Sequence, residues 1–420
     1  MGRISLRRVA FGEIPTVRAS DPEAEAEAGR ILEDVRRDGE KALRHWAERL
    51  GELGPGEPLY LDRAELERAR DSLGPSRRNL LEAAHERIRA FAAAQRACLS
   101  DLDFPVPGGR AGHRFVPVER AGCYVPGGRF PLASSALMTV AAARAAGVGS
   151  VWCAGPHPAA ETLASAAIAG AEGFLAVGGA QAIGALAYGC GPIAPRDVIA
   201  GPGGRFVAAA KRLLFGLVGT EAPAGPSELL VIADKGADPG LVAADLLAQA
   251  EHDIAAIPAL IALEESIVGR VEEALAGLAE SLPERNAATA RGALANGWVF
   301  VAASPEEACA ASDRFAPEHL ELLVSEPRRF SARIRNAGAI FLGPASAEVF
   351  GDYGSGPNHC LPTGGAARFA AGLSVLTFLR ARTWLEIEDP EVPAAQAAQF
   401  ARLEGLEAHA RAAEARAKPR

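Results

Sequence analysis

From about residue 114 onward, short runs of β-branched and other apolar residues alternate with Ala-rich runs of helical length. The runs expected to form strands are residues 148–154, 174–177, 198–200, 229–233, 259–262, 298–302 and 339–342. The helical runs between them include residues 159–170, 205–215, 238–251 and 265–280. This alternation is typical of parallel sheets covered by helices on both faces. Because there are more strands than one small domain needs, the pattern predicts two α/β layers.

Two Pro- and Gly-rich strings mark the borders of a domain. Residues 124–128 (Tyr-Val-Pro-Gly-Gly) and 223–226 (Pro-Ala-Gly-Pro) flank a compact strand–helix block. The fold class expected is α/β, with two Rossmann-like parallel-sheet domains, one inserted into the other, a helical N-terminal region and a helical C-terminal tail. The expected parts are an arm at 1–20, a first domain made of 21–118 and 226–375, an inserted domain at 119–225, and a tail at 376–420.

Charge and cysteine usage exclude several classes of partner. The formal net charge of −8 leaves no cationic excess to neutralise the phosphates of nucleic acid or of an anionic membrane. Six cysteines are scattered without a CxxC pair, which favours reduced thiols over a disulfide framework or zinc ribbon. The first residues lack an apolar signal core, and arginines interrupt the long apolar runs. We therefore expect a soluble cytoplasmic protein that binds neither nucleic acid nor membrane.

Four histidines in the last part of the chain each lie close to an acidic residue. They are His252, His319, His359 and His409. Imidazole ligates metals and moves protons near neutral pH, and a nearby carboxylate fixes its tautomer or shares the metal. Residues so far apart can meet only through tertiary folding or across a subunit boundary. An active site is the leading interpretation.

The first of these histidines follows a glutamine at helical spacing. Gln249 and His252 are three residues apart at the end of an expected helix, so they project from one face. An amide oxygen beside an imidazole is a workable pair of ligands for Zn²⁺. The alternative is that His252 is only a cationic cap favoured by the helix dipole.

The pair Glu318–His319 stands after Pro317 and before an apolar run. It is interpreted either as a general acid/base pair or as an ordinary surface turn. Adjacent side chains on extended backbone point to opposite faces, so both can serve one pocket only if a turn reorients them.

Two further stretches attract a functional interpretation. Residues 351–365 carry five glycines together with Asp352 and His359, and glycine lets backbone approach a ligand closely. In the tail, Glu404 and His409 could share a site only if the helix breaks, and Gly405 is the obvious place; a solvated terminal helix is the alternative. Glycine turns at 178–182 and 201–204 suit phosphate or nicotinamide approach, but equally suit tight βα connections.

With these strings assembled, the chain resembles the histidinol dehydrogenase family, which catalyses the last two steps of histidine biosynthesis. The matching strings lie in the expected order at residues 124–128, 177–183, 223–228, 249–252, 317–320 and 351–363. The resemblance implies an NAD-dependent, four-electron oxidation of L-histidinol to L-histidine via L-histidinaldehyde, by a homodimer with one Zn²⁺ per subunit. The first domain would carry the metal and catalytic residues, the inserted domain would face NAD, and the tail would reach the partner subunit.

The resemblance also implies a role for individual residues. Zn²⁺ would be held by Gln249, His252 and Asp352 of one subunit and His409 of the other. His319 would be the general base, and Glu318 would activate water to hydrate the aldehyde. Ser227, Glu404, His319, His359 and the metal ligands would surround the amino alcohol, with Glu404 suited to its ammonium group.

Tyr124 and Gln181 match positions that contact NAD in this family. A third family contact is an Asn after Gly-Pro-Gly, where this chain has Gly204, so an amide side chain is missing there.

Other functions compete with this interpretation. A related dehydrogenase could oxidise another small polar alcohol, such as a sulfonated diol. A zinc hydrolase is disfavoured because four protein ligands leave no open metal position. A non-catalytic ligand-binding protein would not need an acid/base pair together with a metal set.

Overall fold

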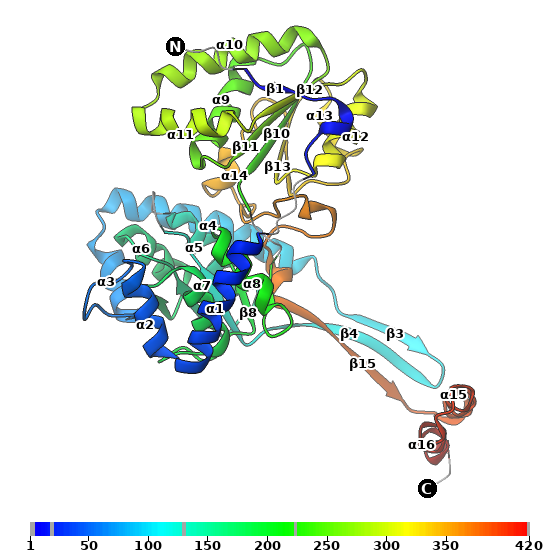
Figure 1. Ribbon diagram of the computed structural model, residues 1–420. Coiled ribbons are helices and arrows are strands. Elements are labelled where there is room, and N and C mark those ends of the chain that lie inside the picture. Colours follow the sequence, from blue (N-terminus) through cyan, green and yellow to red (C-terminus); the bar gives the residue numbers. More distant parts are fainter. Residues whose placement is uncertain (1–4, 17–20, 128–131, 222–224, 418–420) are drawn as a thin grey trace.

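The structure is a computed structural model that describes residues 5–16, 21–127, 132–221 and 225–417. It has two α/β lobes and a long antiparallel arm (Figure 1). Gly128, Pro223 and Ala224, which belong to two of the Gly- and Pro-rich strings, lie outside the described residues, as do residues 1–4 and 17–20 of the expected N-terminal arm.

The upper lobe is built on a six-stranded, all-parallel sheet in the order β1-β12-β11-β10-β13-β14. Its strands are β1 (Arg7–Arg8), β10 (Glu228–Ala233), β11 (Ile257–Ala262), β12 (Trp298–Val301), β13 (His319–Leu323) and β14 (Ala339–Leu342). Its helices are η1 (Phe11–Glu13), α9 (Pro239–His252), α10 (Glu265–Ser281), α11 (Glu284–Leu294), α12 (Pro305–Phe315), α13 (Pro327–Ser331) and α14 (Val349–Asp352). The apolar run of β10 is fully buried because helices cover both sheet faces.

The lower lobe has a second six-stranded sheet, in the order β2-β7-β6-β5-β8-β9. Its strands are β2 (Tyr60–Asp62), β5 (Arg120–Tyr124), β6 (Ser150–Ala154), β7 (Gly173–Leu175), β8 (Val198–Ala200) and β9 (Gly219–Thr220). One face is covered by α3 (Arg63–Ser72), α4 (Pro75–Ala97), α5 (Ala133–Ala146) and α6 (Ala160–Ala169). The other is covered by α1 (Pro22–Asp38), α2 (Glu40–Arg49), α7 (Gly179–Tyr188) and α8 (Arg205–Leu214). All strand pairs are parallel except β2 with β7.

The expected strands and the α/β class are confirmed, but the prediction that residues 21–118 join residues 226–375 is wrong. Helix α1 packs on α7 and α8, and β2 extends the lower sheet. Among the described strands up to residue 118, β1, which precedes residue 21, is the one that pairs with the upper sheet. The inserted unit therefore begins near residue 21 instead of 119. An apolar helix stripe such as Ile31, Leu32 and Val35 shows that a sheet is covered, but not which sheet.

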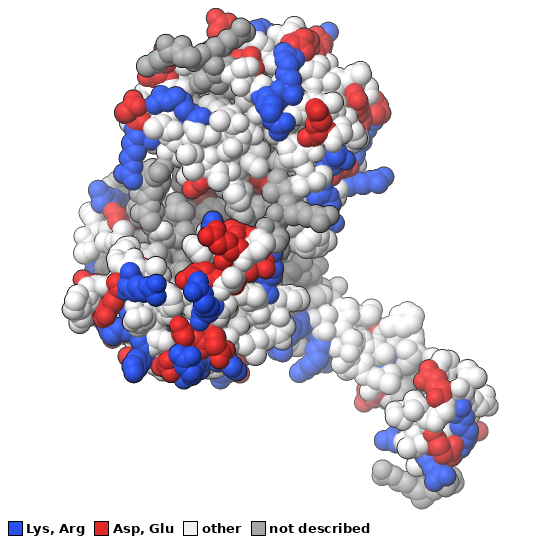
Figure 2. Space-filling model, viewed as in Figure 1, with Lys and Arg blue, Asp and Glu red and all other residues white. Residues whose placement is uncertain are grey.

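The arm is a three-stranded antiparallel sheet in the order β15-β4-β3 that projects from the lower lobe (Figure 1). Its strands are β3 (Leu102–Val106), β4 (Gly109–Pro117) and β15 (Leu379–Ile387), with η2 (Ala366–Arg368) and η3 (Val375–Phe378) preceding β15. Helices α15 (Glu391–Leu403) and α16 (Glu407–Ala417) form its tip, which stands apart from both lobes and carries charges of both signs (Figure 2). The prediction of a wholly helical tail from 376 is wrong for β15, because pairing with β4 outweighs the local pattern.

Within the described ranges, no helix is long and apolar enough to cross a membrane.

Candidate active site

The glycine-rich segment 351–365 joins the two lobes. It follows the upper sheet in the chain, but its side chains and backbone contact helices of the lower lobe. Asn358 Nδ2 donates to the Met138 carbonyl of α5 at 2.9 Å. Arg87 Nε of α4 donates to the Gly354 carbonyl at 2.6 Å. Residues of this segment are therefore fixed at the junction between the lobes, where α14 lies (Figure 1).

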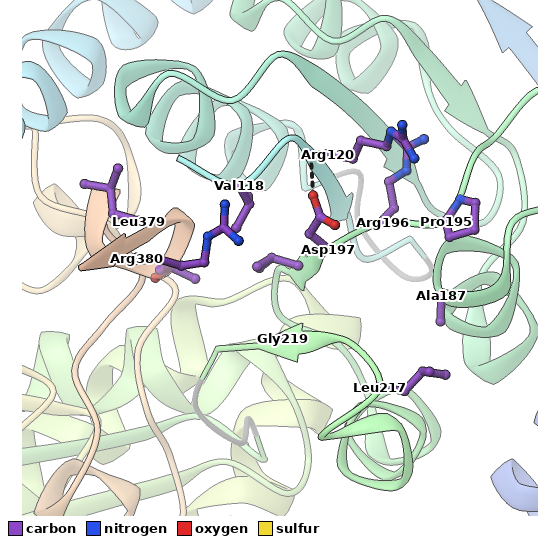
Figure 3. Close-up of a pocket in the computed structure, with 12 residues that line it drawn as sticks. Val118, Arg120, Ala187, Pro195, Arg196, Asp197, Leu217, Gly219, Leu379 and Arg380 are labelled. Carbon is purple, nitrogen blue, oxygen red and sulfur yellow. Dashed lines mark hydrogen bonds between the residues drawn. The ribbon is translucent and has the colours of Figure 1, made fainter. Parts of the chain in front are cut away.

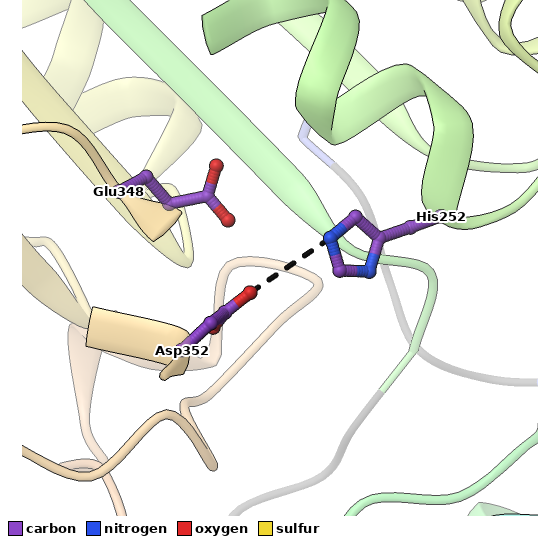
Figure 4. Close-up of side chains that lie close together, drawn as sticks. All are labelled: His252, Glu348 and Asp352. Carbon is purple, nitrogen blue, oxygen red and sulfur yellow. Dashed lines mark ion pairs between the residues drawn. The ribbon is translucent and has the colours of Figure 1, made fainter. Parts of the chain in front are cut away.

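A histidine and two carboxylates converge at this junction. His252 ends α9, Asp352 ends α14, and His252 Nε2 lies 3.8 Å from Asp352 Oδ2. Glu348 directly precedes α14, and one ligand atom from each of the three residues lies within 4.8 Å of the others. Their side chains point toward one another (Figure 4). Glu348 was not predicted, although an acid four residues before Asp352 shares its face of a helix.

Gln249 supplies the strongest sign that this cluster needs a ligand. Its side chain is fully buried one turn before His252, and neither Oε1 nor Nε2 has a hydrogen-bond partner among the described residues. Leaving a buried amide unpaired costs about 1–3 kcal/mol, so such groups call for a partner. Imidazole nitrogen, carboxylate oxygen and amide oxygen together suit Zn²⁺ or a similar divalent ion. The residues present therefore fit the metal that the sequence predicts.

Glu318 and His319 lie side by side and are both buried, which rules out the surface-turn alternative. Ala316, two residues before Glu318, has a left-handed φ of 56° and ends α12, so the chain turns there before β13 begins. His319 Nδ1 is 3.7 Å from Glu318 Oε2 and 3.2 Å from the Glu228 carbonyl oxygen. Because a carbonyl oxygen only accepts, Nδ1 carries the hydrogen and the Nε2 lone pair is free. Burial lowers the pKa of His319 to about 4, so the imidazole is neutral near pH 7.

Glu228 is a second buried acid beside Glu318. Its backbone N–H donates to Glu318 Oε2 at 2.9 Å, and the Glu318 N–H donates back to Glu228 Oε2 at 3.3 Å. Burial raises the pKa of Glu228 to about 7, and burial raises that of Glu318 well above its ordinary range. Glu228 was not predicted. It could have been noticed in the sequence as a charged residue at the start of the otherwise apolar strand β10.

His359 braces the loop that carries Asp352. Its Nδ1 lies 3.2 Å from the Asp352 carbonyl oxygen, and its Nε2 lies 3.4 Å from Ser135 Oγ of α5. Nδ1 therefore donates, and Nε2 accepts from the hydroxyl. His359 and His319 both line a cavity of about 360 Å³, together with Phe341 and Asn358. This cavity has room for a small polar substrate beside the base.

A separate cluster lies at the carboxyl ends of β5 and β8. The Gly179 N–H donates to the hydroxyl of Tyr124 at 3.1 Å, and Gln181 Nε2 donates to Glu52 Oε2 at 3.0 Å. Gly201 has φ of 123°, and a side chain there would run into the Tyr124 carbonyl oxygen. Strand order reverses between β5 and β8, which is where doubly wound sheets bind nucleotides. Glu52 was not predicted, since it belongs to a turn far away in sequence.

Comparison with known proteins shows the family of the chain. The family model described as histidinol dehydrogenase matches residues 16–417. The chain belongs to the histidinol dehydrogenase family. A histidinol dehydrogenase of Gluconobacter oxydans is 43% identical over 411 residues, covering 95% of this chain and 94% of that protein.

Two other relatives extend this comparison. A protein of Ruegeria pomeroyi called a histidinol dehydrogenase homolog is 41% identical over 399 residues, covering 92% of this chain and 91% of that protein. The crystal structure of histidinol dehydrogenase from Elizabethkingia anophelis has a TM-score of 0.90 at 30% identity, and covers 99% of this chain and 98% of that one.

Two residues expected for a histidinol dehydrogenase site lie away from it within one chain. Glu404 and His409 are exposed at the tip of the arm, where Gly405 with φ of 78° separates α15 from α16 (Figure 1). The helix does break at Gly405, which is the condition for Glu404 and His409 to share a site. Ser227 is partly exposed immediately before β10. One chain thus brings His252, Glu348 and Asp352 together, with Gln249 one helical turn before His252, but not the predicted fourth ligand.

Proposed function

We propose that the protein is a zinc- and NAD-dependent histidinol dehydrogenase that oxidises L-histidinol to L-histidine through L-histidinaldehyde. The observation that carries the proposal is the convergence, in a member of this family, of a metal-ligand cluster and a buried acid/base pair at one junction. The His319 ring and the Asp352 cluster are joined through Glu348, whose Oε1 lies 3.9 Å from His319 Nδ1. Oxidation at a metal-held amino alcohol requires these two elements side by side.

We propose that Gln249, His252 and Asp352 hold Zn²⁺ with His409 of the partner subunit. The unpaired amide of Gln249 supports the ligands from one subunit. The position of α16 at the end of a projecting arm supports a ligand from the partner subunit, because such an arm is suited to reach another copy. The protein is then a homodimer with shared active sites. When bound, the ion orients and polarises the hydroxyl of the substrate.

His319 takes the hydroxyl proton at Nε2 in the first oxidation. Its Nδ1 hydrogen is held by the Glu228 carbonyl, so the ring presents its lone pair in a fixed orientation. Because burial lowers the pKa of His319 to about 4, the base is ready without first losing a proton. NAD⁺ supplies the acceptor for the hydride of each oxidation.

Glu318 serves the second oxidation, in which the aldehyde is hydrated. Burial raises the pKa of Glu318, which makes its carboxylate a stronger proton acceptor than a solvated one, and it draws a proton from the attacking water. Ser227 and His359 contact the substrate, and Glu404 of the partner subunit pairs with its ammonium group. Tyr124 and Gln181 contact NAD at the carboxyl ends of the lower sheet's strands.

The test is a measurement of NADH formed from L-histidinol by the purified protein with Zn²⁺. Two NADH per substrate are expected, and Glu318→Gln should reduce the second oxidation more than the first, so that aldehyde accumulates. If the protein does not oxidise L-histidinol but oxidises a sulfonated diol, it is the related dehydrogenase instead. Both alcohols must be assayed because one relative is named only as a histidinol dehydrogenase homolog. Turnover of neither alcohol would refute both assignments.

A further inference from the structure

A second cavity, of about 550 Å³, lies at the opposite end of the lower sheet from Tyr124. It is lined by the starts of β5 and β8 and by the root of the arm, where β15 begins (Figure 3). Val118, Leu217 and Leu379 give it apolar walls. Nothing in the proposed dehydrogenase reaction uses this cavity.

The charges around this cavity are strongly unbalanced. Three guanidinium groups line it, those of Arg120, Arg196 and Arg380, against one lining carboxylate, that of Asp197. Arg120 is also paired with the neighbouring Glu119, at 2.8 Å, so Arg196 and Arg380 are the lining cations without an ion pair among the described residues. Arg120 and Arg196 lie on one side of Asp197, and Arg380 lies on the other (Figure 3). Asp197 Oδ2 already accepts the backbone N–H groups of Glu119 and Arg120, each at 2.9 Å. The cavity is therefore locally cationic in a chain whose net charge is −8.

Arg196 is the most unusual of the three. Its side chain is only 5% exposed, and its partners are the Ala194 carbonyl at 2.6 Å and Ser150 Oγ at 2.9 Å. It forms no ion pair in the part of the chain that the structure describes; Glu172, Asp197 and Glu119 act on it only from a longer distance. A buried cation is normally paired with an anion, because its desolvation is otherwise uncompensated.

We propose that this cavity binds a small oxyanion with two negative charges, of which inorganic phosphate is the simplest and a phosphomonoester metabolite the larger form. The guanidinium fork matches the geometry of phosphate oxygens, and Arg196 and Arg380, which form no ion pair among the described residues, supply two positive charges for a dianion. The cavity falls in the range of roughly 300–1,000 Å³ that is typical of small-molecule sites. A bound anion would connect Arg380 of the arm to Arg120 and Arg196 of the lobe.

The experiment is a calorimetric titration of inorganic phosphate into the full zinc-loaded chain at constant ionic strength. One phosphate per chain is expected, with acetate, which carries a single charge, binding far more weakly. Arg380→Ala should weaken phosphate binding by roughly tenfold or more, as expected for a lost charge-assisted hydrogen bond. Arg382→Ala is the matched control, because Arg382 is exposed on the same strand but does not line the cavity. Its affinity should equal that of the unsubstituted chain.

Two further variants locate the site. Arg196→Gln should also lose phosphate binding; if that variant fails to fold, the exposed Arg380 carries the test alone. Gln249→Leu should bind phosphate normally, because the metal cluster lies elsewhere. Absence of phosphate binding, equal binding of acetate, or unchanged affinity in Arg380→Ala would each overturn the proposal. None of these outcomes depends on whether histidinol is the substrate.

Discussion

Replacing Gln249 by leucine should change the free energy of unfolding in opposite directions without and with Zn²⁺. The amide is fully buried, and neither of its polar atoms has a partner among the described residues. Leucine has a similar volume and carries no polar atoms, so the substitution removes the unpaired groups without opening a large cavity. It also removes one of the proposed zinc ligands. The two effects have opposite signs and appear under different conditions.

The magnitudes follow from these contacts. Without metal, Gln249→Leu should raise the free energy of unfolding by about 1–3 kcal/mol, the usual cost of buried polar groups left unsatisfied. With Zn²⁺ at about a hundredfold of its Kd, the unsubstituted protein should gain about 2.7 kcal/mol, and the variant should gain much less. The variant is therefore the more stable protein in chelator and the less stable one in zinc.

Urea unfolding followed by circular dichroism, in chelator and in Zn²⁺, measures both quantities. Gln95→Leu is the control, because Gln95 lies on α4 outside the cluster and should respond to zinc as the unsubstituted chain does. The reasoning is refuted if Gln249→Leu destabilises the metal-free protein. It is equally refuted if the stabilisation by zinc survives the substitution.

Three other predictions concern the base cluster, the cofactor and the dimer. Because the pKa of Glu228 is raised from 4.5 to about 7, its contribution to stability is complete below pH 4.5 and is lost as the pH rises through about 7. Glu228→Gln should remove up to about 3 kcal/mol of that decline, measured as the free energy of unfolding at about pH 5 and about pH 8. Gly204→Asn should lower the KM for NAD⁺ in steady-state kinetics. A Cβ at this helix N-cap meets nothing within 4 Å, so the new amide faces open space. An unchanged KM would show that an amide at this position has no part in NAD⁺ binding. Mixing His409→Ala with His319→Ala subunits should restore roughly a quarter of the full activity, because half of the dimers would then hold one intact site of two; failure of mixed dimers to recover activity counts against a ligand donated across the interface.

Most of the predicted strands could be found because they are short apolar runs that are largely buried in a sheet, although β14 is only partly buried. Leu229, Val231 and Ala233 are wholly buried, and a run of that kind leaves few alternatives to a central parallel strand. The allocation of helices to sheets could not be predicted, because an apolar stripe fits either sheet. Strand β15 was missed for a related reason: its side chains are mostly exposed, so that its pairing with β4 leaves little periodicity to find.

The residues that converge at the junction were predicted where spacing or family resemblance marked them, and were missed where only burial distinguishes them. Gln249 and His252 stand at helical spacing, and Asp352 stands in a glycine-rich loop. Glu228 and Glu348 are single acids that look like surface residues in the sequence. Only the packing shows that both are almost wholly buried.

The missed acids explain why the junction should bind a cation at all. Glu318, Glu348 and Asp352 form ion pairs only with histidines in the part of the chain that the structure describes. His319, the nearest of these to Glu318 and Glu348, is itself neutral near pH 7, because burial lowers its pKa to about 4. The carboxylates thus lack a full positive charge, and the burial of Glu318 and Glu348 raises the pKa of each. A divalent ion supplies the missing charge and gives the Gln249 amide its partner. The imbalance of charge that makes the junction costly without a metal is therefore the reason we expect it to bind a divalent ion.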